Sequence, residues 1–486
     1  MHDIAYPSVS PASVGIPPKA LASFLKTLKE CRFPLHSALL LRHGKLALET
    51  YCAPFTADTR HRLYSVSKSV TSVAVGRLIT EGRLKLSDTV ASYFPEYLPQ
   101  NPSPYLLRTT VRDLLTMASP NACSAYDFSS PNFVKAFFDN AYPKHLPGAV
   151  FHYDTAGTVT LCALVEKIAG MTLLDYLRPV FDAIGIPDGV RCIKTPEGGS
   201  WTGSGILFTP RELMRFSELC MRMGEWNGVQ LIDREYMRQA TSRQIDNSVS
   251  ESGYRMDGYG YQFWMLKDGG FSCYGMGSQL ALVMPKHDAI FVCTGDTQAM
   301  ANAEDGIREA FYRLLDSFED RCLTQDQADM EKLLEASRLC LPLPRGTDRS
   351  PVETQIDGRL FRFDTNPYGY KWMTLKRQND ALVWSYEKAT GVHSIVLHMG
   401  ALGEAVFPET YSGDTVCTRD KYYRCMTAAA WERENTLLCL AYAVDDYLGT
   451  LKIQFTFSGT EVVVFMAKGA EDFFEDYQGF LAGRFV

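Results

Sequence analysis

Apolar residues follow Ser65 at intervals of three and four positions, which is the spacing of a helix with one face in the core. They are Val66, Val70, Val73, Ala74, Leu78 and Ile79, and Gly82 marks the expected end of the helix. Ser65 stands at the beginning of this helix, and Lys68 follows one turn later. Since residues three apart share a helix face, the pattern predicts that Ser65 and Lys68 point into one cavity.

This pairing of a serine with a lysine suggests nucleophilic catalysis. A serine hydroxyl is a poor nucleophile until a neighbouring base removes its proton. Lys68 could be that base if its pKa were lowered, which partial burial at the N-terminal end of a helix favours. A Ser-x-x-Lys tetrad alone is a weak signal, because about one or two occur by chance in a chain of this size. The catalytic interpretation therefore depends on further motifs downstream.

The pattern over residues 1–320 predicts a mixed α/β (α+β) fold. Residues 17–31 have helical periodicity, and residues 37–51 read as two strands that turn at His43-Gly44. A helical middle follows, and strand-like runs come afterwards, before a final helix. The strand-like runs are 258–264, 277–284 and 289–294, and the final helix covers 303–315. This order implies one antiparallel sheet that is built from both ends of the domain, with an all-helical insert beside it.

The composition changes after a charged helical connector, which we place at 321–349. Residues 350–486 contain short β-type runs separated by turn signals, namely 371–376, 381–385, 393–397, 451–457 and 461–465. They predict a separate C-terminal all-β domain, either a sandwich or a small barrel. We find no catalytic constellation in it, and a lid, spacer or dimerisation role stays open.

Composition and charge limit the classes of molecule that could be partners of this protein. The chain has 486 residues, 46% of them hydrophobic, and a net charge of −7 without a Lys/Arg-rich run, which argues against nucleic acid or an anionic membrane as partner. We expect no secretory signal in the first twenty residues and no membrane span. Thirteen cysteines without a Cys-x-x-Cys pair are typical of reduced thiols in a cytoplasmic protein. Nine histidines show no ligand-like cluster, so we expect no metal and no cofactor.

Two later stretches carry candidate chemistry. Tyr153 lies at the entrance of a helix, where its phenol could relay protons to and from Ser65, or it could be a core aromatic with a satisfied hydroxyl. The small residues around Gly275 and Gly277 could let an acyl group approach a strand edge that offers a free N–H, or could mark a bulge. No third glycine and helix follow, so a dinucleotide fingerprint is rejected.

Taken in order, these blocks resemble the serine β-lactamase-like superfamily, in particular its class C β-lactamase, penicillin-binding-protein-like and esterase group. The resembling blocks lie within residues 10–318: Leu63–Ser72, Thr110–Met117, Pro147–Tyr153, Gly224–Gly228, Gly258–Trp264 and Gly277–Gln279. The resemblance implies a β-lactamase-like antiparallel sheet flanked by helices with a helical insert. It also implies that Ser65 is acylated, that Lys68 and Tyr153 share general acid/base work, and that the N–H groups of Ser65 and Met276 form an oxyanion hole.

The sequence departs from this pattern in two places. Cys273-Tyr274-Gly275 stands where the group has Lys/His-Thr-Gly, so the cation that pairs with the carboxylate of penicillins or of D-alanyl peptides is missing. Thr155 replaces an asparagine and offers fewer hydrogen bonds. Both departures favour an esterase or amidase with an apolar, aromatic pocket, for which we name Tyr126, Trp201 and Trp264 as candidate walls.

We therefore predict a serine hydrolase that cleaves a small ester or amide through an acyl-enzyme on Ser65. An acyl-transferase, a true β-lactamase or D-aminopeptidase, and a non-catalytic ligand-binding member are alternatives from the same fold. The sequence leaves open the substrate, the oligomeric state and whether Lys68 or Tyr153 is the base, since their titrations are coupled.

Overall fold

The computed structural model describes residues 6–121, 130–140, 144–248, 256–324, 326–409, 422–445, 447–470 and 477–486. The chain divides into two compact units. The first consists of Met1–Cys31, Leu35–Gly295 and Glu304–Leu339, and the second of Arg32–Pro34, Asp296–Ala303 and Cys340–Val486.

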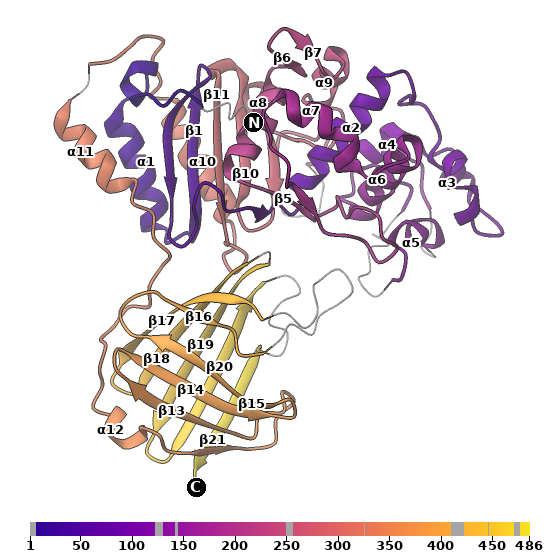
Figure 1. Ribbon diagram of the computed structural model, residues 1–486. Helices are drawn as coiled ribbons and strands as arrows, with labels where there is room; N and C mark the ends of the chain where they lie inside the picture. Colours follow the sequence, from indigo (N-terminus) through magenta and orange to yellow (C-terminus); the bar gives the residue numbers. More distant parts are fainter. Residues whose placement is uncertain are drawn as a thin grey trace. The chain divides into compact units, whose positions relative to one another are not determined.

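The first unit is built on a sheet with the strand order β2-β1-β11-β10-β9-β8 (Figure 1). The strands are β1 (Leu35–Arg42), β2 (Lys45–Tyr51), β8 (Trp264–Met265), β9 (Phe271–Gly275), β10 (Gln279–Met284) and β11 (Ala289–Gly295). β1 pairs antiparallel with β11, with Leu39 opposite Val292, so strands from both ends of this unit meet in the middle of the sheet. His43 and Gly44 have positive φ angles of 52° and 68°, which suits the tight turn between β1 and β2. The predicted hairpin, the antiparallel sheet and the mixed α/β class are confirmed.

Helices cover this sheet. Every residue of β1, β10 and β11 is buried, as expected for strands covered on both faces. α1 (Pro18–Glu30) and α10 (Ala303–Leu315) contact the sheet through Phe24 and Phe311, whose rings lie 5.2 and 5.3 Å from the ring of Phe291 on β11. α8 (Pro210–Met221) contacts β1, β10 and β11, and α2 (Val66–Thr80) contacts β9. The predicted connector contains α11 (Gln327–Ala336), which packs against α1 within the first unit.

The predicted helical insert lies between β2 and β8. Its helices are α2, α3 (Pro104–Leu107), α4 (Val111–Leu115), α5 (Phe133–Asp139), α6 (Thr155–Ala169), α7 (Leu173–Ala183), α8 and α9 (Arg234–Ala240). It also holds the short strands β3 (His61–Arg62), β4 (Arg191–Cys192), β5 (Ile206–Phe208), β6 (Glu225–Trp226) and β7 (Val229–Gln230). Among the described helices, none is by itself long and apolar enough to cross a membrane, and α6 with α7, bent by 82°, meets that test only as a pair and only by length and composition.

The predicted strand over 258–264 is wrong for most of its length, since only Trp264 enters a strand of the sheet. Gln262 explains the difference, because it lies in the left-handed region with φ 65° and its buried amide joins three helices. The amide donates to the carbonyls of Leu114 and Leu115, at 3.0 Å each, and accepts from Thr158 at 2.8 Å, while the backbone oxygen accepts from Ser69 at 2.7 Å. This segment is an anchor between α2, α4 and α6.

The second unit is a ten-stranded antiparallel sheet in the order β15-β14-β13-β12-β21-β20-β19-β18-β17-β16. Its strands are β12 (Phe361–Phe363), β13 (Trp372–Gln378), β14 (Ala381–Lys388), β15 (Gly391–His398), β16 (Gly403–Val406), β17 (Arg424–Arg433), β18 (Thr436–Val444), β19 (Leu448–Ser458), β20 (Glu461–Gly469) and β21 (Gly479–Phe485), after a short helix α12 (Glu353–Ile356). The sheet curls into a near-barrel, because Met399, just after β15, bridges to Ala429 on β17. Buried aromatic rings such as Trp384, Tyr386 and Phe455 fill its inside. The predicted all-β class of this region is confirmed.

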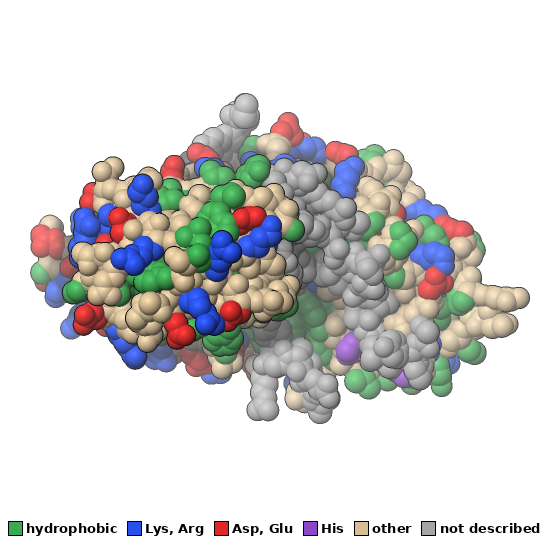
Figure 2. All heavy atoms as spheres, turned by 90° about the horizontal axis from the view of Figure 1, so that it is seen from below, with side chains coloured by type: hydrophobic (Ala, Val, Ile, Leu, Met, Phe, Trp, Pro, Cys, Tyr) green, Lys and Arg blue, Asp and Glu red, His purple; other side chains and the backbone are tan. Residues whose placement is uncertain are grey.

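Some apolar side chains of the second unit face outward. Phe480 on β21 is 68% exposed and Val463 on β20 is 43% exposed. The rings of Phe480 and Phe465 pair across these strands with centroids 4.8 Å apart. The space-filling view shows hydrophobic side chains grouped beside lysines and arginines (Figure 2). Exposed cross-strand pairs of this kind stabilise the sheet itself.

Two buried histidines connect β1 of the main sheet to the insert. His36 Nδ1 on β1 lies 3.1 Å from His61 Nε2 on β3, and the ring of Phe55 stacks on His36 at 3.8 Å. Burial lowers the pKa of His61 to about 4 and the pKa of His36 well below its usual value. Both rings are therefore neutral in the folded protein at neutral pH.

We expect acid to destabilise the first unit through this pair. The unfolded chain takes up protons near pH 6.5, so this stability is complete above pH 6.5 and is lost as the pH falls toward 4. The loss for His61 alone is on the order of 2 kcal/mol between pH 7.5 and pH 5. Urea unfolding at both pH values measures it.

The variant His61→Gln should lose part of this pH dependence. The matched control is His43→Asn, which replaces an exposed histidine at a turn position that asparagine tolerates. The control should keep the full difference between the two pH values. Equal pH dependence in wild type and His61→Gln would show that the buried pair does not titrate on unfolding.

Candidate active site

A strained turn places Ser65 at the start of α2. Tyr64 lies in the left-handed region with φ 47°, which is unusual for an aromatic residue. The carbonyls of Leu63, Tyr64 and Ser65 accept hydrogen bonds from the N–H groups three residues later, so the chain passes from β3 into α2 without a loop. Ser65 is half-buried, whereas Ser67, Lys68 and Ser69 are buried. The turn therefore presents one hydroxyl at the positive end of a helix.

Lys68 contacts Ser65 directly. Lys68 Nζ donates to Ser65 Oγ at 2.9 Å and to the carbonyl of Gly203 at 2.5 Å, and the lysine is only 1% exposed. The nitrogen also lies 5.1 Å from the centre of the Tyr153 ring. The structure thus brings together the three residues that the sequence singled out, from α2 and from the segment that enters α6.

Arg62 supports this arrangement, and the sequence interpretation missed it. Its fully buried guanidinium lies 4.4 Å from the Tyr64 ring and 4.6 Å from the Trp201 ring. It donates to the carbonyl and the hydroxyl of Ser204, at 3.0 and 2.9 Å. Since Gly203, which accepts from Lys68, directly precedes Ser204, Arg62 fixes the residue next to the carbonyl that positions the lysine. A Cβ on Gly203 would lie 2.6 Å from the Thr155 methyl group, so a glycine at this position lets the run 198–205 lie close to the start of α6.

Tyr153 is held by the N-terminus of α6. The buried Asp154 caps this helix, accepting from Ala156 N at 3.0 Å, and accepts from Ser119 Oγ at 3.1 Å. The Tyr153 ring stacks on Trp264 with centroids 5.4 Å apart. Tyr259 packs behind both rings, and burial raises the pKa of its phenol well above the usual value, so Tyr259 stays neutral.

β9 ends beside the nucleophile turn. A Cβ on Gly275 would lie 2.2 Å from the carbonyl oxygen of Leu63, so only glycine lets the strand come this close. Met276 is the next residue. Cys273 faces the core, fully buried, and burial raises its thiol pKa to about 12. Tyr274 points the other way, and its ring lies 6.1 Å from Trp264.

Some of the remaining predicted site residues lie beside Tyr153, and others do not. Trp264 and Tyr274 share an aromatic cluster with Tyr153, and Thr155 begins α6 beside Gly203. Trp201 is fully buried against Arg62, so it supports the site from behind and lines no open surface. Tyr126 lies outside the described residues. Across the described ranges, no three His, Cys, Asp or Glu side chains gather as a possible metal site, and the expected absence of metal stays a prediction.

All these site residues lie inside a stretch that matches a known family. The model of the family described as Beta-lactamase matches residues 21–313 of the chain. The chain belongs to the β-lactamase family. It is a hydrolase of this family, and the resemblance inferred from the sequence is confirmed.

Named relatives are similar over the same part of the chain. The 6-aminohexanoate-dimer hydrolase of Paenarthrobacter ureafaciens is 25% identical over 308 residues, which cover 57% of this chain and 78% of that protein. Esterase EstB of Burkholderia gladioli is 30% identical over 197 residues, which cover 34% of this chain and 50% of the esterase. The solved structure of EstCE1, described as a hydrolase with promiscuous acyltransferase activity, has a TM-score of 0.50 at 18% identity and covers 61% of this chain and 99% of EstCE1. The EstCE1 similarity shows the fold alone.

We expect Arg62→Met to lower kcat for an ester substrate by about 10- to 100-fold with little change in KM, because Ser204, the neighbour of Gly203, loses the donor that fixes it. The free energy of unfolding should fall by about 2–4 kcal/mol, since two buried oxygens of Ser204 lose a charged donor. Steady-state kinetics and urea unfolding measure the two effects.

Two further variants separate positioning from general damage. Arg62→Lys keeps the charge and should recover part of kcat. Arg83→Met removes an arginine whose side chain is 40% exposed just beyond the end of α2. The kcat of this variant should stay within about twofold of the kcat of the unmodified enzyme. Equal kcat in Arg62→Met and the unmodified enzyme would show that Arg62 does not help to position Lys68.

Proposed function

We propose that this β-lactamase-family member is a serine hydrolase that cleaves a small ester or amide through an acyl-enzyme on Ser65. The observation that carries the proposal is the 2.9 Å contact between Lys68 Nζ and Ser65 Oγ. A lysine in hydrogen-bond range of a serine at a helix start can take the hydroxyl proton as the oxygen attacks.

The proposed reaction has two halves. In the first, Ser65 Oγ bonds to the substrate carbonyl carbon, the hydroxyl proton passes to Lys68 or Tyr153, and the carbonyl oxygen becomes an oxyanion. The N–H groups of Ser65 and Met276 are the proposed donors to that oxyanion. The tetrahedral intermediate then collapses, and the leaving alcohol or amine departs with the proton. In the second half, water attacks the acyl carbon and Ser65 recovers its proton.

The residues around the nucleophile favour an uncharged, partly apolar acyl group. Trp264 and Tyr274 stand beside Tyr153, and the position of the family's cation is the buried, neutral Cys273. A substrate carboxylate would meet no charged partner from that position. We therefore expect simple esters and amides to be better substrates than penicillins or cephalosporins.

The names of the relatives agree with this class of reaction. One is a hydrolase of the 6-aminohexanoate dimer, and another is an esterase. Acyl transfer to an added alcohol is a further outcome that the same acyl-enzyme allows, and product analysis with added alcohol measures the share of transfer.

A substrate panel tests the proposal. Hydrolysis of p-nitrophenyl butyrate, butyryl p-nitroanilide and a chromogenic cephalosporin is followed with the unmodified protein and with Ser65→Ala. We expect turnover of the ester, slower turnover of the anilide and little of the cephalosporin, all lost in Ser65→Ala. Ester turnover that persists in Ser65→Ala, or a clear preference for the cephalosporin, contradicts the proposal.

A further inference from the structure

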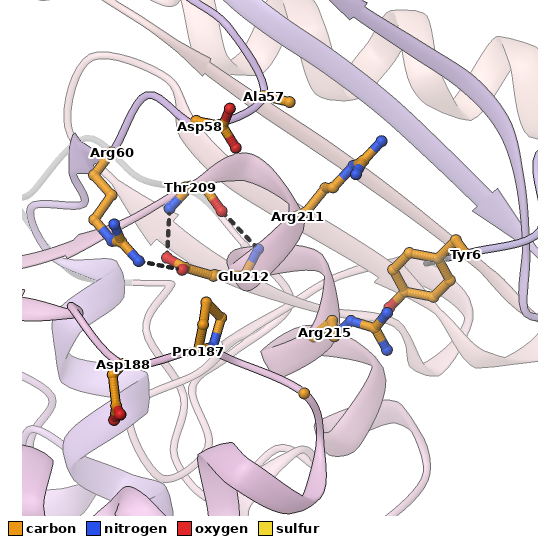
Figure 3. Close-up of a pocket in the computed structure, with 11 residues that line it drawn as sticks. Tyr6, Ala57, Asp58, Arg60, Pro187, Asp188, Thr209, Arg211, Glu212 and Arg215 are labelled. Carbon is orange, nitrogen blue, oxygen red and sulfur yellow. Dashed lines mark hydrogen bonds and ion pairs between the residues drawn. The ribbon is translucent and has the colours of Figure 1, made fainter. Parts of the chain in front are cut away.

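A cavity of about 300 Å³ lies in the first unit, and Ser65, Lys68 and Tyr153 are not among the residues that line it. It is open on one side and is bordered by the segment before β3, the turn after α7 and the first turns of α8, with Tyr6 at one side (Figure 3). Three arginines, Arg60, Arg211 and Arg215, line it. The reaction proposed above does not use this cavity.

Arg215 is the unusual residue of the cavity. It is 6% exposed, and among the described residues no group accepts a hydrogen bond from its guanidinium, which instead lies 4.4 Å from the Tyr6 ring. Glu218, one turn further along α8, has both carboxylate oxygens engaged, by Tyr6 at 2.7 Å and by Arg222 at 2.5 Å. Solvent in the cavity reaches the Arg215 nitrogens, so the guanidinium can bind an anion there without giving up another acceptor.

Arg60 lines the same cavity and is held by Glu212. One of its terminal nitrogens donates to Glu212 at 2.6 Å, and Glu212 in turn accepts from Thr209 N at 2.8 Å (Figure 3). The Nε of Arg60 is buried and has no hydrogen-bond partner. This Nε is closed to solvent, so Arg215 is the guanidinium whose N–H donors remain open to a ligand in the cavity, and charge-assisted hydrogen bonds from a guanidinium are the kind that carboxylates prefer.

A negatively charged side chain, Asp58, also lines the cavity. Asp58 is exposed, lines the cavity and forms no ion pair with any described residue. Figure 3 shows Asp58 and Arg215 on opposite sides of the hydrogen-bonded pair Thr209 and Glu212. Asp58 would repel a polyanion, whereas Arg215 attracts an anionic group. The two side chains together favour a molecule with one charge of each sign.

We propose that this cavity binds a small amino-acid zwitterion, with its carboxylate on Arg215 and its ammonium group toward Asp58. A volume of about 300 Å³ is at the small end of ligand sites and suits such a molecule. Since Arg60 directly precedes β3 and the nucleophile turn, the ligand contacts the segment that leads to Ser65.

Calorimetric titration with 4-aminobutyrate and with leucine tests this proposal. We expect at least one of them to bind saturably, and its matched anion, butyrate or isocaproate, to bind at least about threefold more weakly because it lacks the ammonium group. Inorganic phosphate should also bind more weakly. No saturable binding of either zwitterion, or equal binding of the matched anion or phosphate, overturns the proposal.

Variants of the residues that line the cavity test where the ligand binds. Arg215→Gln should weaken binding by about tenfold or more, and Asp58→Asn by about threefold. Ala57→Phe fills the half-buried edge of the cavity without changing its charge and should also abolish binding, which keeps the test valid if Arg215→Gln does not fold. Arg238→Gln, an exposed control on α9, should bind normally. Unchanged binding in Ala57→Phe overturns the assignment to this cavity.

Discussion

Lys68→Met is expected to lower kcat/KM for p-nitrophenyl butyrate by about 10³- to 10⁴-fold, the largest loss of any variant that keeps Ser65. Methionine has nearly the shape of the lysine side chain but cannot take a proton from Ser65 Oγ, which lies 2.9 Å from Lys68 Nζ. It also gives up the bond to the Gly203 carbonyl at 2.5 Å. Initial-rate kinetics measure the loss.

The matched control for this variant is Lys26→Met, which replaces a lysine on α1 whose side chain is 72% exposed. Its rate should stay within about twofold of normal. Circular dichroism shows whether Lys68→Met is folded. A folded Lys68→Met with more than about a tenth of the normal rate would mean that another group activates the serine.

Tyr153→Phe is expected to lower kcat by about 10²-fold or more while KM changes little, because only the phenol oxygen is lost. The phenylalanine ring can still stack on Trp264, where the centroids are 5.4 Å apart, and can still lie beside Lys68 Nζ. The split between kcat and KM separates proton transfer from packing.

Tyr259→Phe provides the comparison, since it also deletes one phenol oxygen from the same aromatic cluster. Burial keeps Tyr259 neutral, so we expect its loss to change kcat by less than about threefold. Similar losses in both variants would indicate that the cluster acts only through packing and that Tyr153 is not the proton relay.

The fold of the first unit followed from periodicity because its elements are locally consistent. The apolar spacing after Ser65 and the His43-Gly44 turn each gave an element that the structure contains, α2 and the β1–β2 hairpin. The run 258–264 failed for a tertiary reason, since Gln262 is fixed by carbonyls of α4 that no local pattern reveals. In the second unit, β17 and β18 were not predicted, because most of their residues are buried and these strands lack the apolar–polar alternation that marks a half-buried strand.

Part of the candidate site could be predicted from the sequence. The spacing of Ser65 and Lys68 was sufficient to place both on one helix face. Tyr153 was a candidate from its place at a helix entrance, and the resemblance to the family gave it a role in general acid/base work. The support from Arg62 could not be predicted, because it depends on Trp201 and Ser204, about 140 residues further along the chain. Trp201 shows the opposite error, since an aromatic residue in a glycine-rich run suggested a pocket wall, whereas it is buried against a guanidinium.

The most direct test of the acyl-enzyme account is the mass of the intact protein after reaction with a fluorophosphonate, followed by mapping of the modified peptide. We expect one adduct per chain, located on Ser65, no adduct in Ser65→Ala, and slower labelling in Lys68→Met. An adduct on any other residue, or equal labelling of Ser65→Ala, would contradict the assignment of Ser65 as the nucleophile.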